Sequence, residues 1–376
     1  MRYFLIAGEA SGDLHAAHLI HSLREQDPEA EFRFYGGDMM AAEAPGLLRH
    51  YRTLAYMGII AVVQHLPEIL RGMRQCREDI SNFRPDAVIL VDYAGFNLRI
   101  ARYVHDAAIC PVFYYIAPKL WAWKEGRIKQ IKRYVDHLYS ILPFEKEFFE
   151  QKHGYPITYV GNPTADEIHA FVETSGKPQT DGKTIALLPG SRHQEVRDNL
   201  SRMLRAVSSL PEKGFRIAVA AAPALPRHFY EQIVAQSPLQ AGQVEIVDNQ
   251  TYKLLSHAAA ALVTSGTATL ETALMRVPQV VCYYTRFGSI VALLRKLLIK
   301  VKHISLVNLI ADAEVVPELV ANEMTPENVR QHLMTILPNG TRREEMLAGY
   351  EKVAQRIGEA GAPERCAANI IKRLKQ

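Results

Sequence analysis

Four short polar segments follow runs of apolar residues, and their side chains are of types that can hold and transform a phosphorylated substrate. They are Gly8–Asp13, Asp92–Asn97, Gly190–Glu195 and Ser265–Glu271. Open parallel sheets bind ligands beyond the carboxyl ends of their strands. If the apolar runs are strands, the four segments stand where such sheets bind their ligands.

The turn Ser265-Gly266-Thr267 precedes a helical pattern, and this combination suits a diphosphate. It offers hydroxyl donors and unpaired backbone N–H groups at the positive end of a helix dipole. Gly266 allows close approach because it has no side chain. Glu271, one turn further, is placed to accept hydrogen bonds from both hydroxyls of a ribose. The alternative is an ordinary helix cap by Ser265 or Thr267, with Glu271 as an acidic residue of the first turn.

Gly190-Ser191-Arg192, followed by Glu195, forms a second candidate phosphate site. An arginine at a strand-to-helix turn can donate two charge-assisted hydrogen bonds to a phosphate. The alternative is a capping box, in which Ser191 or Arg192 lies near the cap and Glu195 reaches back to the cap N–H. The capping box explains Ser191 and Glu195 but gives the side chain of Arg192 no role.

Asp92 follows the strongly apolar run Ala87–Val91 and is the candidate general base. A carboxylate at the end of such a strand is placed to take a proton from a substrate, which contributes about 10²–10⁴ in rate. The alternative is a cap for a helix that starts near Phe96 or Asn97, although Asn97 suits that role better.

Glu9, Ser11 and Asp13 lie in a loop bounded by glycines. Asp13 can cap the helix predicted at Leu14–Arg24, and Ser11 can close a turn. Glu9 has no comparable structural role, so it is the member of this loop most readily assigned to a ligand.

Two apolar segments with basic flanks, Met57–Leu70 and Phe287–Lys302, are predicted to be helices. Apolar helices edged with Lys and Arg can lie in a membrane interface and attract anionic headgroups. The side chains predicted to face the membrane or acyl chains are Ile60, Val63, Leu66, Ile69, Leu70, Leu294 and Leu298. The alternative is a pair of amphipathic core helices with solvated flanks.

Apolar runs alternate with amphipathic segments along the chain, which predicts two parallel sheets covered by helices on both faces. The predicted strands are Arg2–Ala7, Glu31–Tyr35, Ala87–Val91, Val112–Ile116, His137–Leu142, Thr158–Val160, Thr184–Leu188, Arg216–Ala220, Val244–Val247, Ala260–Val263 and Gln279–Tyr283. The polar segment Glu173–Thr184 indicates a linker. The predicted α/β domains are residues 1–172 and 184–340, joined by linker 173–183 and followed by helices in 341–376.

The composition excludes several classes of protein. Among 376 residues, 44 Lys and Arg against 40 Asp and Glu give a net charge of +4, too small for a dedicated nucleic-acid-binding protein. The four cysteines form no CxxC pair, which argues against a zinc ribbon or a disulfide framework. The sequence shows no signal peptide and no apolar stretch of the ~18 residues that span a bilayer. We therefore expect a soluble, cytoplasmic protein.

The familiar nucleotide and hydrolase motifs are missing. G-x-G-x-x-G, D-x-D, H-E-x-x-H and G-x-S-x-G do not occur. Gly182-Lys183-Thr184 lacks the first glycine of a P-loop and precedes a strand instead of following one. These absences argue against hydride transfer, P-loop ATP hydrolysis and serine hydrolase chemistry, and leave no metal-chelating acidic pair.

Further motifs accompany these segments in a fixed order. The set is GEASGD (Gly8–Asp13), Met57-Gly58-Ile59, D-x-x-x-F-N (Asp92–Asn97), Trp121-Ala122-Trp123, LPFEK (Leu142–Lys146), LLPGSR-x-x-E (Leu187–Glu195), SGTATLE (Ser265–Glu271) and Ile304–Ile310 around Asn308. Together they closely resemble the lipid-A-disaccharide synthases, inverting glycosyltransferases, over nearly the whole chain. Lys119 departs from the family pattern, in which a small polar residue is commoner before the Trp pair.

The resemblance implies a glycosyltransferase-B fold, with two Rossmann-like domains facing across a cleft and C-terminal helices returning to the first. It also implies the reaction: UDP-2,3-diacylglucosamine and 2,3-diacylglucosamine 1-phosphate form a β(1→6) disaccharide and UDP on the route to lipid A. The implied scheme needs no cofactor, metal ion or nucleic acid. It places the enzyme peripherally at the inner leaflet of the inner membrane. The oligomeric state stays open, with a homodimer as one candidate.

The resemblance also implies roles for individual residues. Asp92 is the general base, and Arg192 binds the donor or stabilises the leaving group. The donor side comprises Gly190, Ser191, Arg192, Glu195, Ser265, Gly266, Thr267, Glu271 and Asn308. The acceptor side comprises Glu9, Ser11, Asp13, Met57 and Asn97.

Two other functions remain open at this point. One is another UDP-sugar enzyme of the same fold, such as a cell-wall N-acetylglucosaminyl transferase or a UDP-sugar epimerase. The other is a non-catalytic peripheral protein that binds a nucleotide sugar or anionic lipid. A soluble epimerase needs no lipid-facing surface, and a non-catalytic protein releases no UDP.

Overall fold

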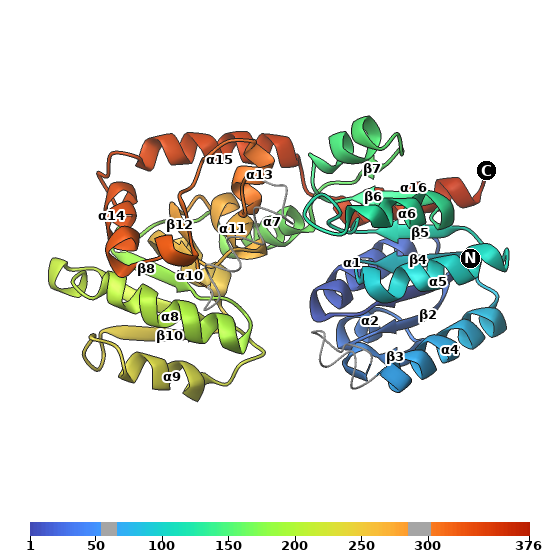
Figure 1. Ribbon diagram of the computed structural model, residues 1–376, viewed down its shortest axis with the longest axis horizontal. Helices are drawn as coiled ribbons and strands as arrows, with labels where there is room; N and C mark the ends of the chain where they lie inside the picture. The colour runs from blue at the N-terminus through green and yellow to red at the C-terminus, as the bar shows by residue number, and fades with distance from the viewer. Residues whose placement is uncertain (54–65, 285–301) are drawn as a thin grey trace. The chain divides into compact units, whose positions relative to one another are not determined.

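The structure is a computed structural model that describes residues 1–53, 66–284 and 302–376 (Figure 1). The chain forms two units, each with its own parallel sheet. The first unit consists of Met1–Pro163 and Ala360–Gln376, and the second of Thr164–Glu359. The two predicted parallel sheets are thus confirmed.

A seven-stranded parallel sheet in the order β3-β2-β1-β4-β5-β6-β7 forms the first unit. Its strands are β1 (Arg2–Ala7), β2 (Glu31–Gly36), β3 (Leu47–His50), β4 (Ala87–Val91), β5 (Val112–Tyr115), β6 (His137–Ser140) and β7 (Thr158–Tyr159). Its helices are α1 (Ala10–Gln26), α2 (Asp38–Glu43), α4 (Leu66–Phe83), α5 (Ala94–Asp106), α6 (Ile128–Tyr134) and α16 (Ala362–Leu374), with short turns η1 (Tyr51–Thr53) and η2 (Glu125–Arg127) and the π-helix η3 (Glu147–Lys152).

Alternate residues of each central strand enter two different hydrophobic cores. Phe4 and Ile6 pack with α4, α5 and α6 on one face of the sheet. Tyr3 and Leu5 pack with α1 and α16 on the other. The strands are apolar throughout because helices cover both faces. Ala7 pairs with Val91, so the loops that follow β1 and β4 leave the sheet side by side.

A six-stranded parallel sheet in the order β10-β9-β8-β11-β12-β13 forms the second unit. Its strands are β8 (Thr184–Leu188), β9 (Arg216–Ala221), β10 (Val244–Asp248), β11 (Ala258–Val263), β12 (Gln279–Tyr283) and β13 (Glu318–Val320). Its helices are α7 (Pro163–Ser175), α8 (His193–Val207), α9 (Arg227–Ala235), α10 (Thr251–His257), α11 (Thr267–Leu274), α13 (Leu306–Ala311), α14 (Pro326–Ile336) and α15 (Arg343–Ile357), with turns η4 (Pro211–Lys213) and η5 (Ala321–Glu323). Val263 pairs with Leu188, which brings the loops after β8 and β11 together.

The boundary between the units differs from the predicted linker at 173–183. Helix α7 belongs to the second unit, because Ile168 is buried in its core and Phe171 packs against that core. The polar segment after α7 is held to the same unit, since Gln179 N donates to Ser256 O at 2.8 Å. The chain therefore passes from the first unit to the second at Pro163 and Thr164, ten residues before the predicted linker begins.

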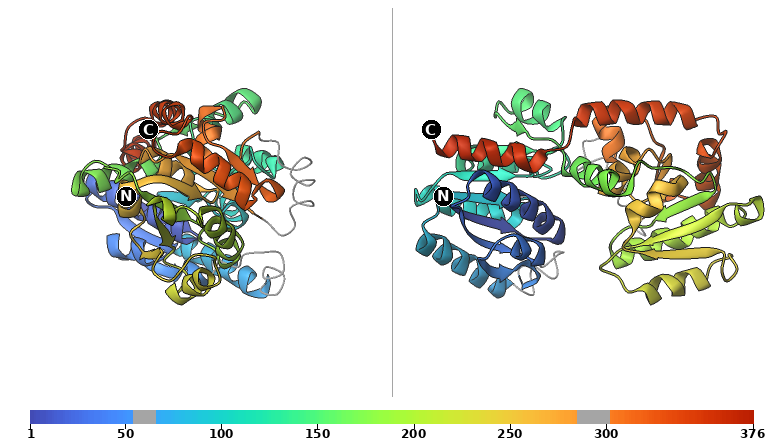
Figure 2. Two further views of the ribbon diagram at one scale, coloured as in Figure 1. Left: turned by 90° about the vertical axis from the view of Figure 1, so that its left-hand side faces the viewer. Right: turned by 180° about the vertical axis from the view of Figure 1, so that it is seen from behind.

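The C-terminal helices also divide differently from the prediction for residues 341–376. Helix α15 stays in the second unit, where Tyr350 Oη donates to Val277 O at 3.1 Å. Only α16 packs on the first unit, where Tyr139 Oη donates to Asn369 Oδ1 at 2.9 Å. Figure 2 shows α16, in red, lying along the strands of the first unit. Of the C-terminal helices, only α16 therefore returns to the first unit.

Candidate active site

Asp92 lies at the carboxyl end of β4 in a strained backbone conformation. Its φ is 44° and that of Tyr93 is 45°, so two consecutive non-glycine residues adopt the left-handed region. The carbonyl of Asp92 accepts a hydrogen bond from Tyr114 Oη and another from Asn97 Nδ2, the latter at 2.8 Å. Helix α5 begins at Ala94 without a side-chain cap, so the alternative capping role of Asp92 is absent. Strain held by neighbouring groups is typical of functional positions.

Burial raises the pKa of the Asp92 carboxyl, and the positive charge of Lys119 acts in the opposite direction. A carboxyl with a raised pKa is a stronger base when it is deprotonated. Lys119 lies in the loop that follows β5, the strand next to β4 in the sheet. The charge of Lys119 therefore acts on the candidate base.

Asn97 holds the backbone around the candidate base. It is fully buried, and its Nδ2 donates to the carbonyl oxygens of Val91 at 3.2 Å and Asp92 at 2.8 Å. Its predicted acceptor-side contact stays a prediction. Asn97 supports Asp92 from behind, and it does not cap α5.

Helix α1 begins at Ala10, four residues before the predicted start, so Ser11 and Asp13 lie in its first turn and only Glu9 precedes it. Asp13 is buried and accepts hydrogen bonds from the backbone N–H groups of Gly37 at 2.6 Å and Met39 at 3.1 Å. It thereby holds the start of α2 instead of capping its own helix. Ser11 is exposed, and Glu9 is partly exposed. Burial and the charge of Glu9 raise the pKa of the Tyr93 phenol. The segment after β1 lies against Tyr93, because a Cβ added to Gly8 would lie 2.2 Å from the Tyr93 ring.

The Trp121 and LPFEK motifs meet at a buried carboxyl group. Glu145 accepts hydrogen bonds from Trp121 Nε1 at 3.0 Å and from Ser140 Oγ at 2.8 Å. Burial raises the pKa of Glu145 to about 7. Lys119 acts on this carboxyl as well as on Asp92. Sequence reasoning singled out both motifs without giving Glu145 a role.

In the second unit, Arg192 pairs with Glu195 instead of forming a capping box. Its Nη1 donates to Glu195 Oε1 at 3.1 Å, and its side chain is 66% exposed. Arg192 is the N-cap residue of α8, without a side-chain cap bond. Gly190 has a φ of 111°, and an added Cβ would lie 2.9 Å from Glu195 Oε2. The carboxylate thus orients a guanidinium that remains accessible to an anion. Ser191 beside it is exposed.

Asn199 joins three strand ends of the second unit and was not predicted. Its Nδ2 donates to Pro189 O at 3.4 Å and to Thr264 Oγ1 at 3.2 Å, and its Oδ1 accepts from Tyr284 N at 2.8 Å. It thereby fixes the loops after β8, β11 and β12 relative to one another. No sequence motif signals this role, because the partners come from three separate segments.

The turn before α11 leaves a helix N-terminus accessible. Gly266 is the N-cap residue, without a side-chain cap bond, and both it and Thr267 are exposed. The predicted alternative of a cap by Ser265 or Thr267 is therefore absent. Ser265 Oγ instead donates to Ile304 O at 3.2 Å. The uncapped N–H groups suit an anion.

Glu271 lies one turn along α11 beside a second carboxylate. Tyr252 Oη is 3.4 Å from Glu271 Oε1 and 2.8 Å from Glu167 Oε2. Burial and the charge of Glu167 raise the pKa of Glu271 to about 7. Glu271 is partly exposed, so it can meet a ligand.

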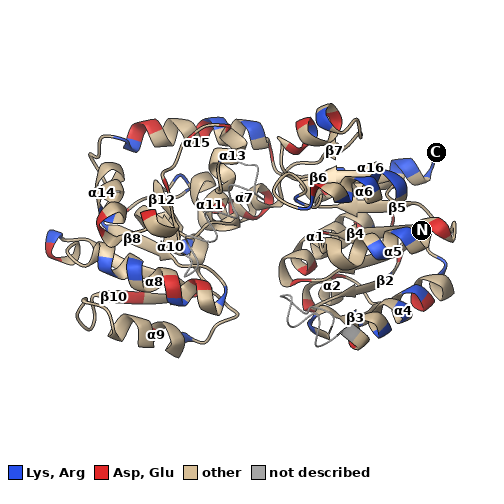
Figure 3. Ribbon diagram, in the orientation of Figure 1, with Lys and Arg blue, Asp and Glu red and all other residues tan. Residues whose placement is uncertain are grey.

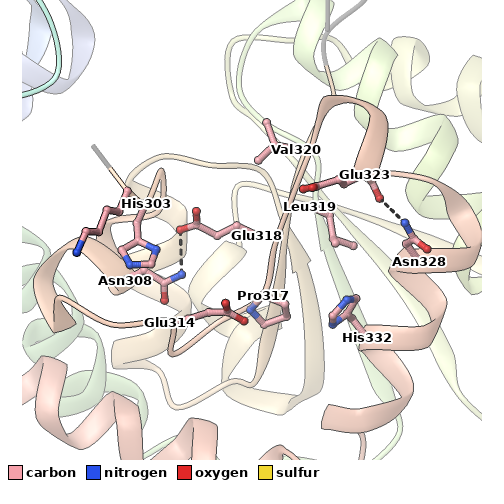
Figure 4. Close-up of a pocket in the computed structure, with 11 residues that line it drawn as sticks. His303, Asn308, Glu314, Pro317, Glu318, Leu319, Val320, Glu323, Asn328 and His332 are labelled. Atoms are coloured by element: carbon pink, nitrogen blue, oxygen red, sulfur yellow. Dashed lines mark hydrogen bonds between the residues drawn. The ribbon is translucent and has the colours of Figure 1, made fainter. Parts of the chain in front are cut away.

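Asn308 lines a cavity of 620 Å³ in the second unit (Figure 4). Its Oδ1 accepts from the N–H of Val315 at 2.8 Å and of Val316 at 2.9 Å. Its Nδ2 donates to Val316 O at 2.8 Å and to Glu318 Oε1 at 2.9 Å, a bond drawn dashed in Figure 4. Two donor and two acceptor positions are the full capacity of an amide. Asn308 therefore fixes the polypeptide around Glu318, and its predicted place on the donor side stays a prediction.

Comparison with known proteins gives the family. The sequence profile described as "Lipid-A-disaccharide synthetase" matches residues 3–371. The chain belongs to this family. It is 38% identical to the lipid-A-disaccharide synthase of Myxococcus xanthus over 99% of this chain and 97% of that protein. It is 36% identical to that of Nitrosococcus oceani over 99% and 96%. The resemblance read from the motifs is confirmed.

Solved structures of more distant proteins share the fold of this family member. The UDP-GlcNAc 2-epimerase of Neisseria meningitidis, bound to UDP-GlcNAc, superimposes with a TM-score of 0.65 at 13% identity over all of both chains. The calicheamicin glycosyltransferase CalG4 superimposes with a TM-score of 0.60 at 16% identity over 100% of this chain and 97% of that one. At these identities the likeness supports the predicted glycosyltransferase-B-like fold alone.

Most residues predicted to face lipid in this synthase-family chain lie outside the described residues. The residues concerned are Ile60, Val63, Leu294 and Leu298, and the side chain of Leu66 is not described either. Met57, predicted on the acceptor side, also lies outside the described residues. Of the others, Ile69 is partly buried against the core of the first unit, whereas Leu70 is 53% exposed. None of the described helices is long and apolar enough to cross a membrane. Within the described ranges, no group of three or more His, Cys, Asp or Glu side chains is arranged to hold a metal ion.

Proposed function

We propose that this chain is a lipid-A-disaccharide synthase. It joins UDP-2,3-diacylglucosamine to 2,3-diacylglucosamine 1-phosphate and releases UDP. The observation that carries this proposal is the family match over residues 3–371. The strained, partly buried Asp92 at the end of β4 supplies a base for such a transfer.

The second unit binds the nucleotide part of the donor. The accessible guanidinium of Arg192 and the uncapped N-terminus of α11 at Thr267 bind the diphosphate. Gly190, Ser191 and Gly266 shape these two turns, and Ser265 holds the second by its bond to Ile304. Glu271 accepts hydrogen bonds from the ribose hydroxyls. Glu195 orients Arg192.

The first unit supplies the base for the acceptor. Asp92 takes the proton of the acceptor's 6-hydroxyl, whose oxygen attacks the anomeric carbon from the face opposite UDP. The bond from that carbon to the diphosphate oxygen breaks, and UDP leaves with the electron pair. Arg192 and the α11 N-terminus stabilise the developing negative charge. Glu9 and Ser11 are the accessible acceptor-side residues beside Asp92.

The enzyme works as a peripheral protein on the inner leaflet, where both acylated substrates reside. Within the first unit, Trp123 is 57% exposed and Lys124 Nζ lies 4.3 Å from the centre of its ring. Helix α6 carries further basic residues, coloured blue in Figure 3. An exposed tryptophan flanked by cations suits the boundary between headgroups and acyl chains.

Sedimentation with liposomes tests the membrane proposal. The protein is expected to sediment with vesicles that contain phosphatidylglycerol, less so at high salt because charge attraction is screened, and little with neutral phosphatidylcholine vesicles. Absence from the pellet with anionic vesicles would refute a peripheral location.

A product assay tests the catalytic proposal. UDP is expected to appear only when the acylated donor and the acylated acceptor are both present, together with a disaccharide of the summed mass. UDP release without the acceptor, or conversion of UDP-N-acetylglucosamine to an epimer, would favour the rival UDP-sugar enzymes. Binding without UDP release would favour a non-catalytic protein.

A further inference from the structure

In the second unit, two carboxylates from two helices lie beside a phenol from a third helix. Glu167 comes from α7, Tyr252 from α10 and Glu271 from α11. Tyr252 Oη lies 2.8 Å from Glu167 Oε2 and 3.4 Å from Glu271 Oε1. Phe171 packs edge-on against the Tyr252 ring, with 5.7 Å between ring centres. The phenol is therefore held between the two acids.

One phenol hydroxyl, that of Tyr252, is shared between the two carboxylates. A tyrosine hydroxyl has one proton to donate, so it can satisfy only one of the two carboxylates at a time. The shorter distance favours Glu167, which leaves Glu271 beside a like charge in a partly buried site. Neighbouring carboxylates resist simultaneous ionisation. Burial is the largest cause of the raised pKa of Glu271, about 7, and the charge of Glu167 raises it further.

Besides burial, the groups that act on the pKa of Glu271 include Glu167, which raises it, and Tyr252, whose hydrogen bond lowers it. Helix α13 and strand β11, which pack near α11, carry no ionisable side chain. On α15, Glu351 pairs with Arg276 and Tyr350 bonds to Val277 O. On β12, the pKa of Tyr283 responds to Glu195 and Arg192.

We propose that Glu167 and Tyr252 are positioning residues that hold Glu271 in a proton-sharing pair, and that a nucleotide-sugar ribose binds Glu271 with release of a proton. This inference rests on the donor role proposed for Glu271. Two ribose hydroxyls each donate a hydrogen bond, so the ligand favours the carboxylate, which offers acceptors on both oxygens. The proton that Glu271 holds in the free protein passes to solvent.

The affinity for the nucleotide sugar is expected to depend on pH through the ionisation of Glu271. The carboxylate form of Glu271 binds the ribose, and this form is depleted as the pH falls below about 7. Affinity for the nucleotide sugar is therefore expected to weaken by about five- to tenfold between pH 7.5 and pH 6. Replacing Glu167 by a neutral side chain removes the like charge, so the pH dependence moves to lower pH.

Isothermal titration calorimetry with UDP-N-acetylglucosamine tests the proposal, because the diphosphate diester of this probe has no group that titrates near neutrality. Titrations in two buffers of different ionisation enthalpy give the number of protons released. The wild-type chain is expected to release protons near pH 6.5 and to bind more tightly at pH 7.5 than at pH 6. Glu167→Gln should tighten binding at pH 6 and reduce the proton release.

Two further variants separate this role from a structural one. Tyr252→Phe removes the hydrogen bond that favours the carboxylate, so the pH dependence should move to higher pH. Glu173→Gln removes a charge from the same helix α7 at an exposed position and should behave like the wild type. Carbon-13 NMR of the ligand-free protein should show a glutamate carboxyl that titrates near pH 7 and titrates lower in Glu167→Gln.

Different results would overturn the inferred proton release and the proposed function. A wild-type chain that binds the nucleotide sugar equally at pH 6 and pH 7.5 would leave the donor site intact and overturn the inference. An unchanged pH dependence in Glu167→Gln would also overturn it. Failure of the wild type to bind at either pH would overturn the proposed function and the inference with it.

Discussion

At the scale of single residues, Asp92 combines backbone strain with a supporting shell. Left-handed backbone at a non-glycine residue costs about 1–3 kcal/mol. Tyr114 and Asn97 hold the strained carbonyl, so the side chain is fixed at the strand end. Sequence alone could place Asp92 at this position but could not show the strain, because the supporting phenol comes from another strand.

Asp92→Asn is expected to reduce turnover by about 10²–10⁴, because the amide cannot accept the acceptor's proton. Binding of UDP-N-acetylglucosamine by the second unit should be unchanged. Steady-state rates of UDP release and calorimetric affinity measure the two effects. A variant with near-normal turnover would remove Asp92 from the mechanism.

Lys119→Met is expected to move the acidic limb of the pH–rate profile to higher pH. The carboxylate form of Asp92 is the active base, and Lys119 lowers the pKa of this group. Without the positive charge the pKa rises, so the rate begins to fall at a higher pH. Lys124→Met, which removes a nearby charge that contacts Trp123, is the control. Superimposable profiles for wild type and Lys119→Met would contradict this coupling.

Arg192→Ala is expected to weaken affinity for UDP by about ten- to a hundredfold, the effect of losing charged hydrogen bonds worth about 1.5–3 kcal/mol. Calorimetry with UDP measures the change. Arg197→Ala on the same helix is the matched control, since that guanidinium lies over the Phe229 ring. Equal affinities for Arg192→Ala and the wild type would exclude the phosphate contact.

At the scale of elements, the covered strands and the edge strands β7 and β10 were predictable from the sequence, and the other two edge strands were not. The apolar runs of β1, β4, β8 and β12 match their observed bounds, because a strand covered on both faces must be apolar throughout. The edge strands β3 and β13 were missed. Their sequences, LLRH and ELV, are short and mix charged with apolar residues.

The residues that support the site could not be predicted from the sequence, because their partners lie far away along the chain. Asn199 bonds to Thr264 and Tyr284, which lie 65 and 85 residues away along the chain. Only the folded sheet brings such partners together. The side chains of Asn97, Asp13 and Asn308 bond to the backbone of other segments, which the sequence could not show.

Asn199→Ala is expected to lower the free energy of unfolding of the second unit by about 1–3 kcal/mol, because it leaves buried polar partners unsatisfied. UDP affinity should fall as well, since the loops after β8 and β11 lose their common anchor. Urea denaturation and calorimetry measure the two effects. Ser201→Ala on the same helix should change neither, and wild-type stability for Asn199→Ala would argue against the anchor.

At the scale of the whole molecule, the chain completes its first unit only with its last residues. Residues 164–359 form the second unit before α16 returns to the core shared with α1. Cys366, Ala367 and Ile370 are fully buried there. The first unit therefore depends on the two ends of the sequence.

Ile370→Ala is expected to lower the free energy of unfolding of the first unit by about 2–5 kcal/mol, the usual cost of a buried cavity. Lys372→Ala, at an exposed position of the same helix, should stay within about 0.5 kcal/mol of the wild type. Urea denaturation followed by tryptophan fluorescence reports on this unit, which contains Trp121 and Trp123. Similar losses in both variants would contradict the packing of α16.

A crystal structure of the protein with bound UDP tests most directly the claim that the second unit holds the leaving group. The diphosphate is expected within hydrogen-bond distance of the Arg192 guanidinium and the backbone N–H of Thr267, with the ribose hydroxyls on Glu271. Nucleotide bound away from Arg192 and Thr267 would contradict it.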